Sequence, residues 1–245
     1  MTKQEPNNSM VLLRGSIAGL NRSRRSYDFV PTEARHQQVG VNAIAASVMG
    51  MGATGTGLIG MAGNSEEEAD WVEFELDGKQ VKGWLWMLPM RNGDIVEVVA
   101  EPTGNNRYVA YAVKRDGDDL LAVYPHATAG RKVHYRKSVK AWMWCSCLAY
   151  MILPLFAVMQ RGLGTLRDAH MQSFLLTEFP ICMLVSAVIA FRVSRKFMGF
   201  VRIAETIFKT FGWPDPEHID LRQTSKDNRR ENKLDNFGHL YFRYK

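Results

Sequence analysis

A stretch of twenty residues without a charged side chain constrains this chain more than any other feature. It runs from Ala141 to Gln160 and reads AWMWCSCLAYMILPLFAVMQ. A helix of this length spans about 30 Å, the thickness of the hydrocarbon core of a bilayer. Trp142 and Trp144 stand near one end, where aromatic belts form, and Pro154 is tolerated inside a membrane span. The segment therefore predicts a transmembrane helix over residues 141–160.

A second apolar segment, residues 173–191, also has the length of a membrane span and reads SFLLTEFPICMLVSAVIAF. It contains Glu178 and Pro180 near its first end. A carboxylate inside a bilayer is costly, so it is either functional or close enough to the interface to reach the headgroups. Because Glu178 stands early in the segment, interface placement is the favoured interpretation, and an intramembrane role is the alternative.

Lysine and arginine residues flank the two predicted spans unequally. Residues 131–140 form a basic juxtamembrane segment with five basic residues and no acidic one, and further basic residues follow the second span. The short connection, residues 161–172, has few charges. The positive-inside rule therefore predicts a helical hairpin with both termini in the cytoplasm and the connection outside. The basic residues expected near the headgroups are Arg131, Lys132, Arg136, Lys137, Lys140, Arg195 and Lys196.

The net charge of +6 is concentrated next to the apolar segments. Residues 1–130 hold 12 Lys and Arg against 16 Asp and Glu, a net charge of −4. This placement of basic residues points to anionic headgroups as the partner before nucleic acid. The polar start, MTKQEPNNSM, lacks the apolar region of a secretory signal, so the amino-terminal part is expected to stay in the cytoplasm.

Apolar and polar residues alternate with a period of two before the first span, as they do in half-buried strands. WVEFELDGKQVKGWLWM contains a hairpin signal at Asp77-Gly78, and GDIVEVVAEP, RYVAYAVKR and DDLLAVYPH follow it. Earlier strands are expected at Met10–Leu20 and around YDFVPT. The pattern predicts a small β-barrel or sandwich, OB-like, built from residues 1–36 and 66–130. The fold class is therefore an α+β membrane protein.

Four aromatic residues of this β domain could stack on nucleic-acid bases: Trp84, Trp86, Tyr108 and Tyr111. The acidic run EEEAD and the net charge of residues 1–130 would repel phosphates. The local basic cluster, NRSRRS at Asn21–Ser26, is expected to be a solvated loop. Nucleic acid is therefore a disfavoured partner.

A glycine-rich tract interrupts the β pattern. Gly50, Gly52 and Gly55 spell G-x-G-x-x-G, but neither a buried strand before them nor a helix start after them supports a dinucleotide site. The uncharged insertion, residues 37–65, instead carries small residues four apart, which allow close contact between membrane helices. It is either a membrane-inserting or self-associating segment, or a flexible loop or helical hairpin resting on the barrel. The candidate packing and insertion residues are Gly50, Gly52, Thr56, Gly60 and Glu178.

The carboxyl-terminal part begins with FMGFVRIAETIFKTF, whose apolar residues recur at helical spacing. Residues 192–213 predict an amphipathic cytoplasmic helix that lies on the membrane or on the barrel. Glu205 and Lys209 are expected to pair on its other face, and Gly212 with Pro214 to end it. Residues 214–245 predict a polar linker and an aromatic tail, FGHLYFRYK, that either docks as a strand or binds a partner.

Candidate catalytic groups do not form a recognisable arrangement in the sequence. Cys145, Cys147 and Cys182 lie in the apolar segments and are expected to be small apolar fillers. His126 is expected at a turn leaving the barrel, and it and His134 have no carboxylate pattern suited to a metal. The sequence thus predicts no catalytic residue, no metal site, no cofactor and no enzymatic activity.

Several segments together carry a family resemblance: LLRGSIAGL, YDFVPTEA, the glycine tract, EEADWVEFELDGKQVKGWLW, GDIVEVVAE and VYPHATAGRK, followed by the hairpin. In this combination the chain resembles a bacterial family of type VI secretion system effectors of the membrane-hairpin type. The resemblance implies a link to contact-dependent secretion, and it carries no catalytic residue across.

The sequence and this resemblance lead to two functional hypotheses for a bacterial inner-membrane protein. In the first, the chain is an effector that inserts into a bilayer, there or in a target cell, and permeabilises it without enzymatic chemistry. Self-association into a homo-oligomer would accompany this action. In the alternative, the hairpin is a non-toxic anchor that presents the cytoplasmic β domain to a secretion-apparatus or immunity protein.

Overall fold

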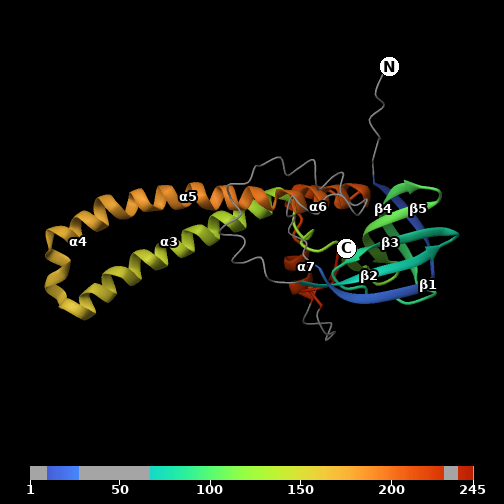
Figure 1. Cartoon of the computed structure of the whole chain (residues 1–245), viewed down its shortest axis with the longest axis horizontal. Coiled ribbons are helices and arrows are strands. Elements are labelled where there is room, and N and C mark those ends of the chain that lie inside the picture. Colours follow the sequence, from blue (N-terminus) through green and yellow to red (C-terminus); the bar gives the residue numbers. More distant parts are fainter. Residues whose placement is uncertain (1–9, 28–66, 229–236, 245) are drawn as a thin grey trace, which may run out of the picture. The chain divides into compact units, whose positions relative to one another are not determined.

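The computed structural model describes residues 10–27, 67–228 and 237–244. They divide into two compact units. The first unit contains the described residues up to Arg131 and those from Gly199 onward, and the second contains Lys132–Met198. In Figure 1 the first unit is built from strands and short helices, and the second from two long helices joined by a turn.

Five strands of the first unit close a barrel. β1 pairs with β2 and β4, β2 with β3, and β4 with β5, all antiparallel, and a parallel pairing of β3 with β5 completes the ring. Two short strands, β6 and β7, extend the sheet beyond β5. The bounds are β1 Val11–Tyr27, β2 Glu67–Leu76, β3 Lys79–Leu85, β4 Ile95–Gly104, β5 Arg107–Arg115, β6 Leu120–Val123 and β7 Phe242–Arg243. Of the two predicted architectures, barrel and sandwich, the barrel is the one formed.

The hairpin between β2 and β3 turns where the sequence predicted. Asp77 and Gly78 have φ angles of 48° and 79°, the positive values that a two-residue hairpin turn of type I′ requires. On the paired strands Val72, Phe74 and Val81 are buried, and the residues between them face outward. The alternation therefore sets which face of this hairpin lines the barrel.

β1 is longer than the sequence predicted. Asn21–Ser26, expected to be a solvated loop, continues β1 and pairs with β2. That expectation is wrong because the segment pairs with β2, where Arg24 donates hydrogen bonds to Glu68 and Asp70. The first part of β1 pairs with β4 and the second with β2, with an irregularity after Ala18. The expected strand around YDFVPT lies outside the described residues after Tyr27.

The barrel is covered on one side by helix α6, Met198–Thr210. Ile203, Ala204, Ile207 and Phe208 are buried in a cluster with residues of β4, β5 and β6. β5 is therefore buried on both faces, and this explains why its sequence AYAV is almost continuously apolar. Of the helix predicted over residues 192–213, the part Met198–Thr210 lies on the barrel, one of the two placements that the sequence left open. Residues 192–196 instead continue the preceding helix, Phe179–Lys196, so the predicted start was too early.

The last described segments also belong to this unit. A short 3-10 turn, Pro216–His218, precedes helix α7, Leu221–Asn228. A polar linker was predicted at this place, but Leu221 is fully buried and holds the helix against the barrel unit. The aromatic tail docks as strand β7, antiparallel to β6, as one of the two alternatives predicted.

The second unit is a helical hairpin. Helix α3 spans Arg131–Arg161, so the basic segment 131–140 and the uncharged stretch 141–160 form one continuous helix. A 3-10 turn, Leu163–Arg167, leads to the returning helix, which runs through α4 (Ala169–Ser173), a π-helical turn (Phe174–Glu178) and α5 (Phe179–Lys196). This returning helix begins before residue 173 and continues past residue 191, the bounds that the sequence suggested.

Candidate functional site

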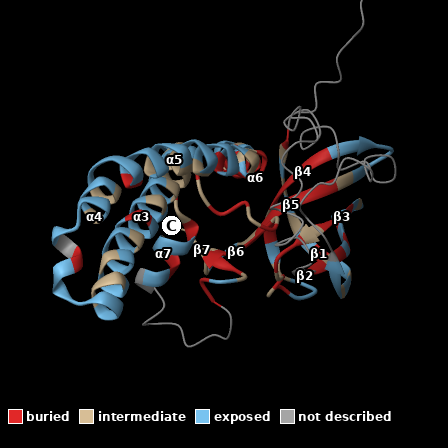
Figure 2. Cartoon of the chain, turned by 60° about the vertical axis from the view of Figure 1, so that its left-hand side comes forward, coloured by how far each residue is buried: buried red, intermediate tan, exposed pale blue. Residues whose placement is uncertain are grey.

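The outer surface of the hairpin is apolar along most of its length. Both helices are long and apolar enough to cross a membrane. The most apolar 18-residue segment is 0% buried in the helix Arg131–Arg161 and 6% buried in the helix Ala169–Lys196. Figure 2 shows the same long helices coloured almost throughout as exposed or intermediate. The core helix of a soluble protein would instead be mostly buried, so this surface needs a cover of low polarity. Exposed members include Trp144, Met151, Leu155, Phe156, Met159, Leu176, Leu184 and Val188.

Polar contacts join the two helices of the hairpin. Trp142 Nε1 donates to Ser186 Oγ at 3.0 Å, and Ser186 Oγ donates to the Met183 carbonyl oxygen at 2.8 Å. Further along, the rings of Tyr150 and Phe179 lie 4.8 Å apart. Hydrogen bonds between helices are a common means of association in a bilayer, where apolar burial offers little driving force. These pairs fix the register of the two helices.

A second polar contact lies toward the basic end of the hairpin. The Ser194 hydroxyl is 3.0 Å from His134 Nε2 and donates to Ser138 Oγ at 3.1 Å. Ser194 is buried between the helices. Sequence reasoning missed this cluster, although its signal was present: serines recur eight residues apart, at 138 and 146 on α3 and at 186 and 194 on α5. Small polar residues at such spacing share one helix face.

Glu178 lies deeper in the hairpin than the sequence suggested. The pairs Trp142–Ser186 and Tyr150–Phe179 align the helices, and Glu178 directly precedes Phe179. It is therefore level with Tyr150, the middle of the uncharged stretch, and not with either end of it. The reason is that the returning helix already begins at Ala169. The Glu178 side chain is exposed and makes no hydrogen bond or ion pair with any described residue.

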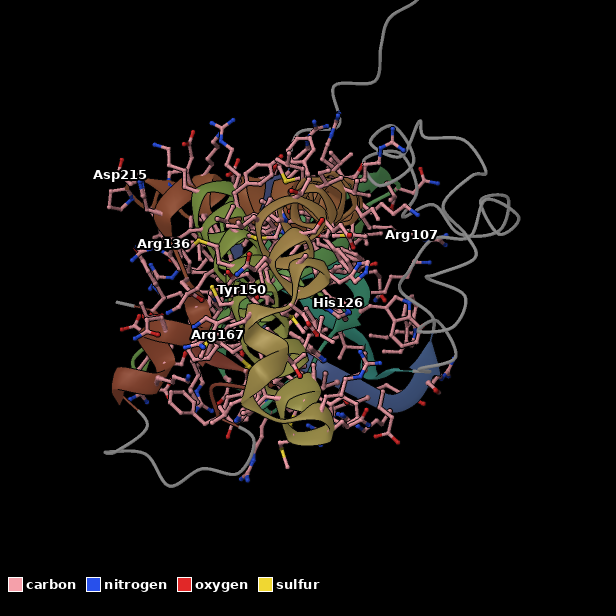
Figure 3. All side chains as sticks on the ribbon, turned by 90° about the vertical axis from the view of Figure 1, so that its left-hand side faces the viewer. Arg107, His126, Arg136, Tyr150, Arg167 and Asp215 are labelled. Atoms are coloured by element: carbon pink, nitrogen blue, oxygen red, sulfur yellow. The ribbon has the colours of Figure 1, made fainter. Side chains whose placement is uncertain are left out.

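The predicted basic residues divide into two groups. Arg131 is held by acidic side chains of the barrel unit: its backbone N–H donates to Glu205 at 2.8 Å, and its guanidinium pairs with Glu217. The expected pair of Glu205 with Lys209 is replaced by this contact, because Glu205 is buried and faces Arg131. The other six belong to the hairpin, where all but the half-buried Lys196 are exposed: Lys132, Arg136, Lys137, Lys140, Arg195 and Lys196. Figure 3 labels one of these six residues, Arg136.

On the barrel, an aromatic pair faces outward from the β2–β3 hairpin. The rings of Trp71 and Trp84 meet edge to face at 5.1 Å, and Trp71 Nε1 donates to Glu73 at 2.9 Å. Both tryptophans are half-buried. The four aromatics considered for base stacking do not form one platform, because Trp86 and Tyr111 are buried and Tyr108 packs against the barrel interior.

A buried carboxyl group pairs with a tyrosine on the covered side of the barrel. Tyr111 donates its hydroxyl hydrogen to Glu101 Oε2 at 3.0 Å. Burial raises the pKa of Glu101 above its ordinary value of 4.5, and the hydrogen bond from Tyr111 lowers it in part. Burial and the neighbouring carboxylate also raise the pKa of Tyr111. Tyr111 belongs to the packed cluster that includes the buried face of α6, and this packing favours a structural role for the pair.

Acid–base and metal chemistry find no further support in the part of the chain that the structure describes. No group of three or more His, Cys, Asp or Glu side chains in that part is arranged to hold a metal ion. His126 has a positive φ of 65° and lies at a turn, as predicted, where its ring contacts Trp86 and Phe200. Asp70 is a structural residue: it accepts hydrogen bonds from Arg24 and from the buried Leu88 N–H.

The predicted packing residues of the glycine tract, Gly50, Gly52, Thr56 and Gly60, lie outside the described residues. The tract connects β1 to β2 along the chain. A scan of protein-family models found no match for this chain, and searches of curated proteins and of solved structures found none either.

Proposed function

We propose that this chain is a membrane-anchored binding module of a bacterial inner membrane. Its hairpin crosses the bilayer, and its barrel lies in the cytoplasm and binds a protein of a secretion apparatus or an immunity protein. The observation that carries the proposal is the apolar surface of the hairpin, left exposed along two helices long enough to span a bilayer. Lipid is the solvent in which such a surface is stable.

The positions of the basic residues support the orientation. Lys132, Arg136, Lys137 and Lys140 belong to the end of α3 that precedes the uncharged stretch, and Arg195 and Lys196 to the matching end of α5. The opposite end, around the turn at residues 162–168, carries few basic residues. By the positive-inside rule the turn lies outside and both chain ends lie in the cytoplasm.

The segments on either side of the hairpin favour an anchoring role. Arg131 is tied to Glu205 and Glu217, and α6 is part of the core that covers the barrel. Both ends of the hairpin thus continue directly into one folded unit. A hairpin that is joined to the barrel unit at both ends would keep the barrel at the membrane surface, as an anchor does.

The barrel is OB-like in its strand pairing. β1 pairs with both β2 and β4, and β3 pairs with β5 in parallel, which closes five strands in the order 1-2-3-5-4. OB-folds are five-stranded Greek-key barrels that bind ligands across the face of strands 2 and 3. On that face this chain presents the Trp71–Trp84 pair beside Glu73 and Lys82. Aromatic residues ringed by charges are typical of protein contact sites.

A second function, permeabilisation of a membrane as a type VI secretion system effector, is favoured by one observation. Glu178 is level with the middle of the uncharged stretch and has no partner among the described residues. An ionisable group at such a depth normally pairs with another polar group or lines a water-filled path. A homo-oligomer of hairpins that encloses such a path is the arrangement this function requires.

The test is expression of the full chain in bacteria, once in the cytoplasm and once behind an export signal, with growth and membrane potential recorded. We expect recovery in the membrane fraction with normal growth and potential in both cases. Depolarisation and arrest, relieved by Glu178→Leu, Gly52→Leu or Gly60→Leu, would instead establish the effector function.

Topology is tested on the same cells with a membrane-impermeant thiol reagent. The native cysteines are first replaced by serine or alanine. A cysteine introduced by Gly164→Cys in the hairpin turn is expected to react from outside, and one introduced by Gln80→Cys on the exposed side of β3 is expected to react only after lysis. Labelling of both positions, or of neither, in intact cells contradicts the proposed orientation.

A further inference from the structure

A groove of about 560 Å³ lies on the exposed side of α3. It is found where the basic part of this helix meets the uncharged part. Its walls are Tyr135, Arg136, Val139, Lys140, Met143 and Trp144. Because these residues recur at intervals of three and four, they share one face of the helix.

The groove combines two cations with an apolar floor. Arg136 and Lys140 are exposed, and neither makes a hydrogen bond or an ion pair with any described residue. They are one turn apart, so their positions differ by about 6 Å along the helix axis. The remaining surface of the groove is supplied by aliphatic and aromatic side chains.

One wall of the groove is fixed by the returning helix. The ring of Tyr135 stacks on Phe191 of α5 at 6.3 Å, with 19° between the ring planes. The guanidinium of Arg195 lies 5.9 Å from the centre of the same Phe191 ring. The packing of α3 on α5 therefore holds the ring of Tyr135, one wall of the groove, in place.

The depth of these groups matches the layers of one leaflet. Lys140 immediately precedes the uncharged stretch, and Trp144 lies one turn inside it. The headgroup layer on each side of a bilayer is about 5–8 Å thick. Arg136 and Lys140 span that layer, whereas Met143 and Trp144 reach the start of the acyl chains.

We propose that this groove binds one anionic phospholipid of the cytoplasmic leaflet. Arg136 and Lys140 both contact the phosphate, the headgroup lies over Val139, and an acyl chain lies along Met143 and Trp144. The two unpaired cations above an apolar floor select this occupant, because a zwitterionic lipid brings a cationic headgroup that cancels the phosphate charge and that Arg136 and Lys140 repel. The proposal rests on the proposed function in one respect, namely that the hairpin crosses the membrane.

The experiment is native mass spectrometry of the full chain in detergent, with phosphatidylglycerol and phosphatidylcholine as competing probes. We expect a preference for phosphatidylglycerol in the wild type. Arg136→Gln should reduce this preference about fivefold, since one cation at an anionic surface contributes about that factor. Lys137→Gln is the matched control: it removes the same charge from the next residue, which does not line the groove, and should leave the preference unchanged.

A second variant separates shape from charge. Val139→Trp keeps every cation and fills the groove, and it should abolish the preference for phosphatidylglycerol. Equal losses in Arg136→Gln and Lys137→Gln, or full retention in Val139→Trp, would mean that surface charge alone attracts the lipid, and would overturn the proposal.

Flotation of the same protein with phosphatidylcholine vesicles tests the proposed function separately. Flotation without a preference for phosphatidylglycerol rejects the groove and leaves the anchored hairpin intact. Failure to float with these vesicles rejects the membrane-anchored function itself.

Discussion

At the scale of single residues, three buried acidic side chains of the barrel unit have three different kinds of partner. Asp70 accepts from Arg24 and from the Leu88 N–H, Glu101 accepts from a tyrosine hydroxyl, and Glu205 accepts from the Arg131 N–H. A buried carboxylate costs stability unless such partners satisfy it. The contacts of Asp70 and Glu205 therefore hold together segments that are distant in sequence, and the contact of Glu101 joins the neighbouring strands β4 and β5.

Replacement of Asp70 tests the first of these contacts. Asp70→Ala leaves the buried Leu88 N–H and Arg24 without their acceptor, and should lower the free energy of unfolding by about 2–4 kcal/mol. Glu68→Ala is the matched control, because Glu68 bonds the same Arg24 at the exposed surface and should cost less than about 1 kcal/mol. Chemical denaturation of both variants measures the difference, and similar losses would contradict the role given to Asp70.

Glu101 should make stability depend on pH. Because its pKa is raised in the folded state, its contribution to stability is fully present below its ordinary pKa of 4.5 and is lost as pH rises through the folded value. Glu101→Gln removes this dependence, so the variant should become more stable relative to the wild type as pH rises above about 4.5. Thermal unfolding across a pH series measures this trend.

Asp118 supplies a control of opposite sign. Two hydrogen bonds from Arg115 lower the pKa of Asp118 below its ordinary value of 3.8. Its contribution is therefore present above that value and is lost as pH falls through the lowered pKa. Asp118→Asn should be less stable than the wild type at neutral pH, and the difference should shrink in acid. If the stability of Glu101→Gln and of Asp118→Asn relative to the wild type changed in the same direction as pH rises, the opposite pKa shifts assigned to the two carboxyl groups would be refuted.

At the scale of elements, closure of the barrel depends on a close approach between β3 and β5. Gly83 of β3 faces Ala110 of β5, and a Cβ atom at Gly83 would collide with the Ala110 carbonyl group. This crossing lies next to the parallel pairing of the two strands. Glycine is required here because the Ala110 carbonyl group leaves no room for a Cβ atom.

Enlargement of Gly83 tests that closure. Gly83→Ala should cost about 1–3 kcal/mol of stability, because the colliding atoms belong to backbone and cannot rotate away. Lys82→Ala changes the preceding, outward-facing residue and should alter stability by no more than about 0.5 kcal/mol. Urea denaturation followed by tryptophan fluorescence compares them, and a neutral Gly83→Ala would mean that β3 and β5 do not approach as described.

At the scale of the whole molecule, the two units differ in how far they bury their apolar side chains. The barrel unit buries two large apolar clusters that draw on its strands, α6, α7 and β7. The hairpin leaves its apolar side chains exposed. One unit thus has an apolar core of its own, whereas the other consists of helices long and apolar enough to cross a membrane, and the chain passes between them at residues 131–132 and 198–199.

Removal of the hairpin tests this division. A chain in which residues 132–198 are replaced by a flexible Gly-Ser linker should be soluble without detergent and should keep the strand content and cooperative unfolding of the barrel unit. Circular dichroism and gel filtration measure this outcome. Aggregation of the shortened chain, together with loss of its β signal, would show that the barrel unit requires the hairpin for folding.

Local patterns in the sequence were sufficient for the features that depend on nearby residues. The length and polarity of residues 141–160 identified an apolar helix, and Asp77-Gly78 located a hairpin turn, because both follow from helix rise and backbone sterics. The bounds of the helices were less accurate, since the basic residues before Ala141 continue α3 with no local stop signal. Residues 221–228 were predicted to be a polar linker, but they form helix α7, because Leu221 is buried and anchors its first turn.

Long-range packing decided the rest. Asn21–Ser26 was predicted to be a loop, but it pairs with β2, where Arg24 donates to Glu68 and Asp70. Glu205 was expected on the outer face of its helix, but it is buried and accepts from the Arg131 N–H. The level of Glu178 with Tyr150 follows from the register of the returning helix against α3, and the six residues of the groove share a face only on a continuous helix. The presence of a β domain and of an apolar hairpin could be read from the chain alone, because periodicity and hydrophobic length are local properties. Which charges are paired, and which residues of the two long helices lie level with each other, was settled by tertiary contacts, because both depend on residues far apart in the chain.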